Sequence, residues 1–170
     1  MRATSAPIAV AAAIALAAAG QAAAKDWPSD PPRINIIDSQ AQRDWAKRYL
    51  DQDDWTLAGF VNDQFWLVSS EVSAHSDYPI VRDWFRVETG RDLDASLPIA
   101  SSLVLAEADC SKTAYRAIRF VNYRGNNLHG AILADVEPPN PKMESWSAGS
   151  IGESVARLIC QGVEPPEASK

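Results

Sequence analysis

Six stretches of the chain have patterns typical of β-strands: most alternate hydrophobic and polar residues with a period of two, and 64–69 is apolar on both faces, as in a central strand. The alternation predicts strands at 55–60, 64–69, 79–88, 101–110, 114–123 and 128–135. The Arg-Gly-Asn-Asn loop at 124–127 indicates a hairpin, because Gly and Asn tolerate positive φ. Consecutive strands that are joined by short loops favour an antiparallel sheet.

A helical pattern precedes the first of these strands, at residues 40–50. Ala41, Trp45 and Tyr49 are spaced by four and form one apolar stripe, while Asp38 or Ser39 can cap the first turn. This pattern predicts a short N-terminal helix.

A second helical pattern follows the last strand and begins with a capping box. Ser150 can accept a backbone N–H of the first turn, and Glu153 can reach back to the start of the helix. The apolar stripe of this helix consists of Ile151, Val155, Leu158 and Ile159. The sequence therefore predicts an α+β fold: an antiparallel sheet of about six strands packed by a C-terminal helix, with a short N-terminal helix in addition.

The two ends of the chain differ from this domain in composition. Residues 1–24 have an Arg, an apolar run and a final Ala-Ala-Ala, which is the pattern of a cleavable secretory signal peptide. The alternative is a membrane anchor, but a spanning helix needs about 20 apolar residues and this run is shorter. We expect a proline-containing, extended and mobile leader at 25–38, a single domain at 39–162 and a disordered tail at 163–170. No cysteine near the cleavage position offers a lipid-anchor site, so we expect a periplasmic or secreted protein.

Charge and composition exclude some classes of function. The chain has a formal net charge of −6, which disfavours binding to nucleic acid because phosphate contacts need a basic surface. Two His and two Cys residues are too few for a Cys/His zinc site, and no motif implies a cofactor.

If the protein is exported, Cys110 and Cys160 can form a disulfide. In an oxidising compartment two thiols tend to pair, whereas in the cytosol they would be buried and free. A pair would close a loop of about 50 residues, which stabilises a small domain by roughly 4 kcal/mol in the chain-entropy model. A redox role is disfavoured because the chain has no Cys-x-x-Cys motif.

The order of aromatic and cysteine positions resembles that of the bacterial surface-adhesin protein E family. The residues that carry the resemblance are Trp55, Phe65-Trp66, Trp84, Asp109-Cys110, Tyr115-Arg116, Tyr123, Trp146, the run 149–153 and Cys160. The resemblance implies a six-stranded antiparallel sheet with a helix, a Cys110–Cys160 disulfide, a protein-binding role at the cell envelope, and dimerisation. The chain departs from the family's lipid-anchored type because it has no cysteine for an anchor, and residues 66–70 lack the aromatic-Asp pattern usual at the end of the second strand. Most members of the family are envelope proteins of unknown role, so adhesion to host matrix is not carried over.

Several residues suggest chemistry but also have plain structural roles. Ser150 could be a nucleophile, but its position as a helix cap accounts for it. His75 and His129 could act as bases or lie on the surface, and the acidic turn 51–54 could hold calcium or simply be solvated.

The sequence thus favours an exported, non-catalytic binding or structural module whose partner is another envelope or extracellular protein. Exposed tryptophans and arginines mark such a surface, because these residue types dominate binding hot spots. The residues that we expect on it are Trp66, Trp84, Arg82, Arg86 and Trp146. The alternatives are a small periplasmic hydrolase, or a carrier that holds a small apolar ligand between sheet and helix.

Overall fold

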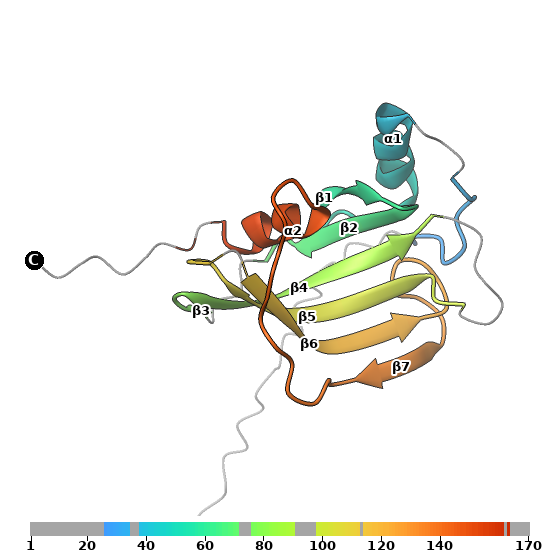
Figure 1. Cartoon of the computed structure of the whole chain (residues 1–170). Helices are drawn as coiled ribbons and strands as arrows, with labels where there is room; N and C mark the ends of the chain where they lie inside the picture. The colour runs from blue at the N-terminus through green and yellow to red at the C-terminus, as the bar shows by residue number, and fades with distance from the viewer. Residues whose placement is uncertain are drawn as a thin grey trace, which may run out of the picture.

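One antiparallel sheet forms the centre of the computed structural model, which describes residues 26–34, 38–71, 76–90, 98–112, 114–161 and 163. The helices are α1 (Ser39–Tyr49) and α2 (Ile151–Ile159), and the strands are β1 (Trp55–Val61), β2 (Gln64–Ser69), β3 (Ser76–Asp77), β4 (Ile80–Thr89), β5 (Ser101–Asp109), β6 (Ala114–Tyr123), β7 (Ile132–Val136) and β8 (Glu144–Ser145). The main strand order is β1-β2-β4-β5-β6-β7 (Figure 1). The two-residue strands β3 and β8 pair with β4 and β6. The predicted α+β fold with six principal antiparallel strands is confirmed.

The last principal strand starts four residues later than predicted. Asn127 and Leu128 have φ angles of 56° and 59°, which no strand residue adopts, so 128–131 belong to the preceding loop. Asn126 and Asn127 are buried in that loop, and their contacts determine its shape. The predicted strand 128–135 is therefore wrong at its beginning.

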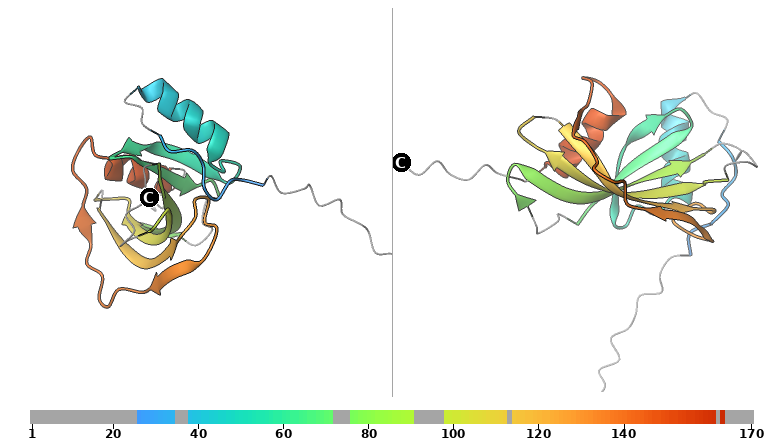
Figure 2. Two further views of the ribbon diagram at one scale, coloured as in Figure 1. Left: turned by 90° about the vertical axis from the view of Figure 1, so that its right-hand side faces the viewer. Right: turned by 60° about the horizontal axis from the view of Figure 1, so that its bottom comes forward.

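The two helices pack on opposite faces of the sheet (Figure 2, left). Helix α2 contacts β1, β2 and β4, and its Val155 and Ile159 join a core with Val68, Phe85 and Val104. We call this side the α2 face. On the other side, the α1 face, α1 lies over the end of the sheet that holds β1 and β2.

Helix α1 is held to its face by aromatic stacking. The Trp45 ring lies parallel to the Phe65 ring, with 4.8 Å between their centroids. Trp45, Ala46 and Leu50 are buried there, and Asp38 caps the helix by accepting the N–H groups of Gln40 and Ala41.

The capping box of α2 forms as the sequence predicts, with one difference. Ser150 Oγ accepts the N–H of Glu153 at 3.2 Å, but the Glu153 carboxylate accepts the N–H of Gly149 and not that of the cap residue. At its other end α2 stops at Ile159, and Cys160 forms the disulfide with Cys110, which follows β5. The Cα atoms of the two cysteines are 5.6 Å apart. The bridge thus joins the middle of the sheet to the end of the helix.

The N-terminal leader, which the sequence predicts to be extended and mobile, contacts the domain in its described part. Trp27 and Ile34 are buried, and the Ile34 N–H donates to the carbonyl of Gly90 at 2.8 Å. The indole N–H of Trp45 donates to the carbonyl of Pro32 at 2.9 Å. Residues 26–34 therefore pack on the domain as part of it.

The remaining predictions for the chain ends lie outside the described residues, namely the signal peptide at 1–24 and all of the tail except Val163. Val163 packs against the α2-face core. Neither of the helices in the described residues has the length and apolar character that a bilayer crossing requires.

Candidate partner-binding surface

The five residues that the sequence predicts as a partner surface lie on different faces of the sheet. Trp66 points to the α2 face and stacks on Phe85, with 5.6 Å between ring centroids. Trp146 is on that face too, 4.0 Å from the ring centroid of Tyr115. Trp84 and Arg82 occupy the positions of β4 that alternate with the core residues Val81 and Phe85, so they lie on the α1 face. The five residues therefore do not form one surface.

Arg86 is not a surface residue at all, and its prediction as one is wrong. The residue is only 1% exposed, its guanidinium carbon lies 4.8 Å from the ring centroid of Trp55, and it donates to the carbonyl of Asp51. The carboxylate of Glu88 faces it at 3.7 Å. Burial lowers the pKa of Arg86, and Glu88 and Asp51 oppose that effect. The alternation within 79–88 does not reveal that Trp55 and the acidic turn cover Arg86.

Glu88 is the centre of a buried polar network that sequence reasoning missed. It accepts the side-chain N–H of Asn126 at 3.0 Å and the backbone N–H of Asn127. Its complete burial raises the pKa of Glu88 to about 7, although Arg86 acts in the opposite direction. The Asn127 side chain in turn donates to the carbonyls of Pro28 and Tyr49. The network joins the leader, α1 and the 124–130 loop, so its role is structural.

The exposed arginines of β4 and β6 are neutralised by carboxylates. Arg82 and Arg116 both bind Glu107, the former at 2.6 Å. Burial alone would raise the pKa of Glu107, but hydrogen bonds from the two arginines lower it below its ordinary value. Arg119 pairs with Asp135 at 2.7 Å. All three guanidinium groups are therefore paired with carboxylates.

A row of side chains crosses the α1 face beyond the helix itself. Trp55 on β1 lies opposite Ser69 on β2, and Trp84 on β4 lies opposite Leu105 on β5. The β2–β4 register, with Val68 opposite Phe85, places Ser69 beside Trp84. The row therefore reads Trp, Ser, Trp, Leu from one strand to the next.

This row contains an open groove of about 270 Å³. We call it the aromatic groove; its lining residues are Asp54, Trp55, Ser69, Glu71, Trp84 and Leu103. Trp84 and Leu103 are half-buried, whereas Asp54 and Glu71 are exposed. The sequence marked Trp84 but not Trp55, which it places in a strand without indicating that it would line a groove.

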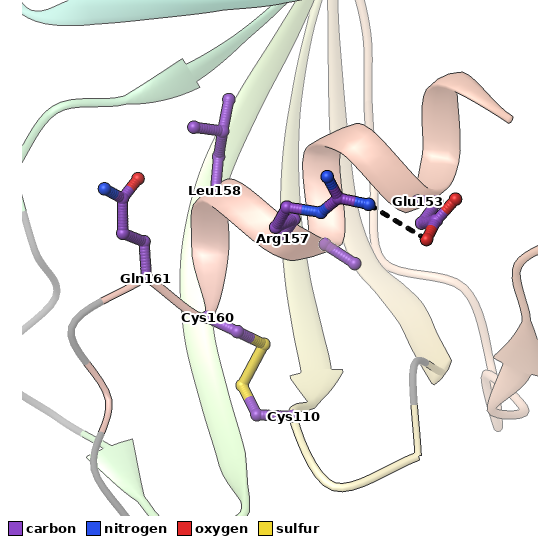
Figure 3. A pocket seen from close by; sticks show the side chains of 7 residues that line it. Cys110, Glu153, Arg157, Leu158, Cys160 and Gln161 are labelled. Carbon is purple, nitrogen blue, oxygen red and sulfur yellow. Dashed lines mark hydrogen bonds and ion pairs between the residues drawn. A yellow bond between two sulfur atoms is a disulfide. The ribbon is translucent and has the colours of Figure 1, made fainter. Parts of the chain in front are cut away.

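A second groove, of about 590 Å³, opens beside the disulfide (Figure 3). Its residues are Cys110, Glu153, Ala156, Arg157, Leu158, Cys160 and Gln161. An ion pair of 3.0 Å joins Arg157 to Glu153 at one side, and Gln161 lies apart from that pair, beyond Leu158 (Figure 3). Apart from Cys110, all of these residues belong to α2 or to the turn after it. The groove is thus not the cavity between sheet and helix that a carrier of an apolar ligand requires.

The residues with possible catalytic chemistry do not converge. Ser150 Oγ is used as the cap of α2, and His129 is exposed in the 124–130 loop. His75 lies outside the described residues. Within the described part of the chain, no group of three or more His, Cys, Asp or Glu side chains is placed to hold a metal ion, and the acidic turn 51–54 is included in that statement.

The edge strand β7 is the other exposed apolar feature. It pairs with β6 on one side only, and Ile132 and Val136 are 58% and 51% exposed. Such an edge has unpaired backbone groups and can accept an added strand.

Comparisons with known proteins give one family from the sequence and one fold from the structure. The family model described as surface-adhesin protein E matches residues 47–161. No curated protein matches the chain in sequence. Among solved structures, a selenomethionine form of Haemophilus influenzae protein E has 16% identity and a TM-score of 0.50, with 81% of this chain and 96% of that chain covered.

Two further structures of protein E match with lower scores. Crystal form II of the Haemophilus influenzae protein has 18% identity and a TM-score of 0.47 over 65% of this chain and 89% of that chain. Protein E from non-typeable Haemophilus influenzae has 14% identity and a TM-score of 0.47 over 65% of this chain and 77% of that chain.

Proposed function

Because this chain belongs to the surface-adhesin protein E family, we propose that it is an exported protein of the cell envelope that binds another protein and has no catalytic activity. The single observation that carries the binding role is the aromatic groove. Two tryptophans, Trp55 and Trp84, line a hollow on the α1 face of the sheet. Aromatic side chains in partly buried positions are the residues that contribute most to protein–protein affinity.

Export is supported by the N-terminal sequence and by the disulfide. Residues 1–24 have the composition of a signal peptide, and a Cys110–Cys160 bridge persists only in an oxidising compartment. We expect the mature protein to begin at Lys25 in the periplasmic or secreted fraction. Mass spectrometry of the N-terminal peptide measures this, and recovery of intact Met1 from that fraction would contradict export by cleavage.

The absence of catalysis is proposed because the candidate groups have other roles or stand alone. Ser150 caps a helix, and Glu107 is held by two arginines. A purified protein that hydrolysed any substrate of a broad esterase, peptidase and phosphatase panel, with the activity lost in His129→Ala, would contradict this part of the proposal.

Site-specific photo-crosslinking tests the binding role. A benzoylphenylalanine in place of Leu103 lies in the aromatic groove, and the matched control carries it in place of Arg157, whose side chain is 77% exposed on α2. Irradiation of intact cells should give a discrete adduct with a second protein at position 103 and not at 157. Identical adduct patterns at both positions, or none at 103, would exclude the groove as the binding surface.

A further inference from the structure

We propose that the aromatic groove receives an arginine side chain that the partner protein presents. This inference rests on the proposed binding function and specifies the chemistry of its partner.

The spacing of the two indoles is the first argument. Trp55 and Trp84 occupy the same row on strands that are separated by β2, and neighbouring strands lie about 4.8 Å apart, so the two side chains start roughly 10 Å apart. The residue between them is Ser69, whose small side chain leaves the groove open. Because stacked groups approach to about 3.5–4 Å, one flat group between two rings needs them about 7–8 Å apart, which is close to the roughly 10 Å at which these two side chains start.

The charge at the groove is the second argument. Among the described residues that line it, the charged side chains are the exposed carboxylates of Asp54 and Glu71, and none is basic. A cationic group that enters would be attracted by both carboxylates, while a phosphate or carboxylate ligand would be repelled. The negative net charge of the chain favours approach of a basic segment as well.

The protein uses the same interaction beside the groove, on the ring of Trp55. The guanidinium of Arg86 lies over the Trp55 ring at 4.8 Å, in a buried position where Glu88 faces it. A guanidinium is planar, stacks on an indole and can bind a carboxylate with two parallel N–H groups. An ammonium group offers no flat surface, so the geometry favours arginine over lysine.

NMR titration with short peptides tests the assignment. The probes are three blocked pentapeptides, Gly-Ser-X-Ser-Gly, in which X is arginine, lysine or citrulline, which has arginine's shape without its charge. We expect the arginine peptide to shift the indole N–H signals of Trp55 and Trp84, with the Trp146 signal on the opposite face as internal control. Citrulline should bind at least tenfold more weakly, and added salt should weaken the arginine complex.

Three variants separate the contributions of rings and charges. Trp84→Leu should reduce affinity for the arginine peptide at least tenfold, and the double variant Asp54→Asn/Glu71→Gln about fivefold or more. Glu137→Gln, which removes an exposed carboxylate next to β7, should leave the affinity unchanged. Circular dichroism and thermal melting establish that each variant is folded before it is titrated.

The outcomes distinguish this inference from the binding function itself. Equal shifts with arginine and citrulline, or an unchanged affinity in Trp84→Leu, would overturn the arginine assignment. An adduct at position 103 without any peptide shift would also overturn it, while the binding function would stand. Self-association that Trp84→Leu abolishes would assign the groove to a second copy of this chain and so overturn the proposal.

Discussion

Asp83 is a carboxyl group that the core of the α2 face encloses. It is 7% exposed, lies between the core residues Val81 and Phe85 on β4, and accepts the backbone N–H of Trp84 at 2.7 Å. Burial raises the pKa of Asp83 to about 6, and the hydrogen bond from Trp84 lowers it in part. The folded protein therefore binds a proton at this site more tightly than the unfolded chain does.

This difference predicts a pH dependence whose sign follows from proton binding. Between the unfolded pKa of 3.8 and about 6, the folded state holds more protons, so the free energy of unfolding falls as pH rises. A pKa difference of about two units between the folded and unfolded states changes the free energy of unfolding by roughly 2–3 kcal/mol. We expect Asp83→Asn to match the wild type near pH 4 and to be more stable by up to about that amount at pH 8.

Urea denaturation at pH 4, 6 and 8 measures the difference between the two proteins. Glu88, with a pKa of about 7, acts in the same direction in the wild type and in the variant. The free energy of unfolding of the variant should therefore still fall as the pH rises to about 7. A constant difference between variant and wild type at all three pH values would contradict the assignment to Asp83.

Gly152 is a second residue whose environment determines the effect of a substitution. A Cβ atom at this position would lie 2.8 Å from the ring of Trp146, which packs on Tyr115. Alanine favours a helix over glycine by about 1 kcal/mol, but the overlap with a packed ring outweighs that gain. We expect Gly152→Ala to lower the melting temperature, and the same change in a Trp146→Leu background to raise it. An increase in the wild-type background would contradict the contact.

At the scale of elements, the disulfide is the covalent link between helix α2 and the sheet. The double variant Cys110→Ala/Cys160→Ala removes a cross-link that spans 50 positions of sequence. We expect it to lower the free energy of unfolding by up to about 4 kcal/mol, because the unfolded chain gains conformational freedom. Urea unfolding of the variant, and of the wild type with and without reductant, measures the loss. An unchanged midpoint in both experiments would show that helix packing alone supplies the stability.

Strands and helices were predictable wherever a local pattern governs them. Alternation in 79–88 and 114–123 placed β4 and β6 within a residue, and Ser150 defined the start of α2. The start of β7 was not predictable, since Asn127 takes its positive φ while bound to Glu88, which is 39 positions away. No local pattern reports such a contact.

The candidate site was predictable only in part, for a similar reason. Alternation places Trp84 on the face opposite Phe85, which the structure bears out. Which residues of that face remain open depends on where α1 and the leader lie, and this is a property of tertiary packing. Arg86 became buried and Trp55 became a groove residue as a result.

At the scale of the whole molecule, the leader is part of the folded domain. A protein that begins at Asp38 lacks the buried Trp27 and Ile34, and it lacks the Ser29 carbonyl that accepts the N–H of Asn126. Burial of two large apolar side chains contributes roughly 3–6 kcal/mol. We expect the shortened protein to unfold at a lower urea concentration than one that begins at Asp26. Equal urea midpoints for the two proteins would show that residues 26–34 do not contribute to stability, as expected of a mobile leader.

The Cys110–Cys160 bridge has a consequence for proteolysis of the mature protein. The exposed connection between β7 and α2, residues 137–150, lies between the two cysteines in sequence (Figure 1). A protease of the surroundings that cuts there produces two polypeptides, yet the sulfur–sulfur bond keeps them as one molecule with α2 in place. The cut form would run at full size on a denaturing gel until a reducing agent is added. A nicked molecule can therefore keep its fold and its aromatic groove.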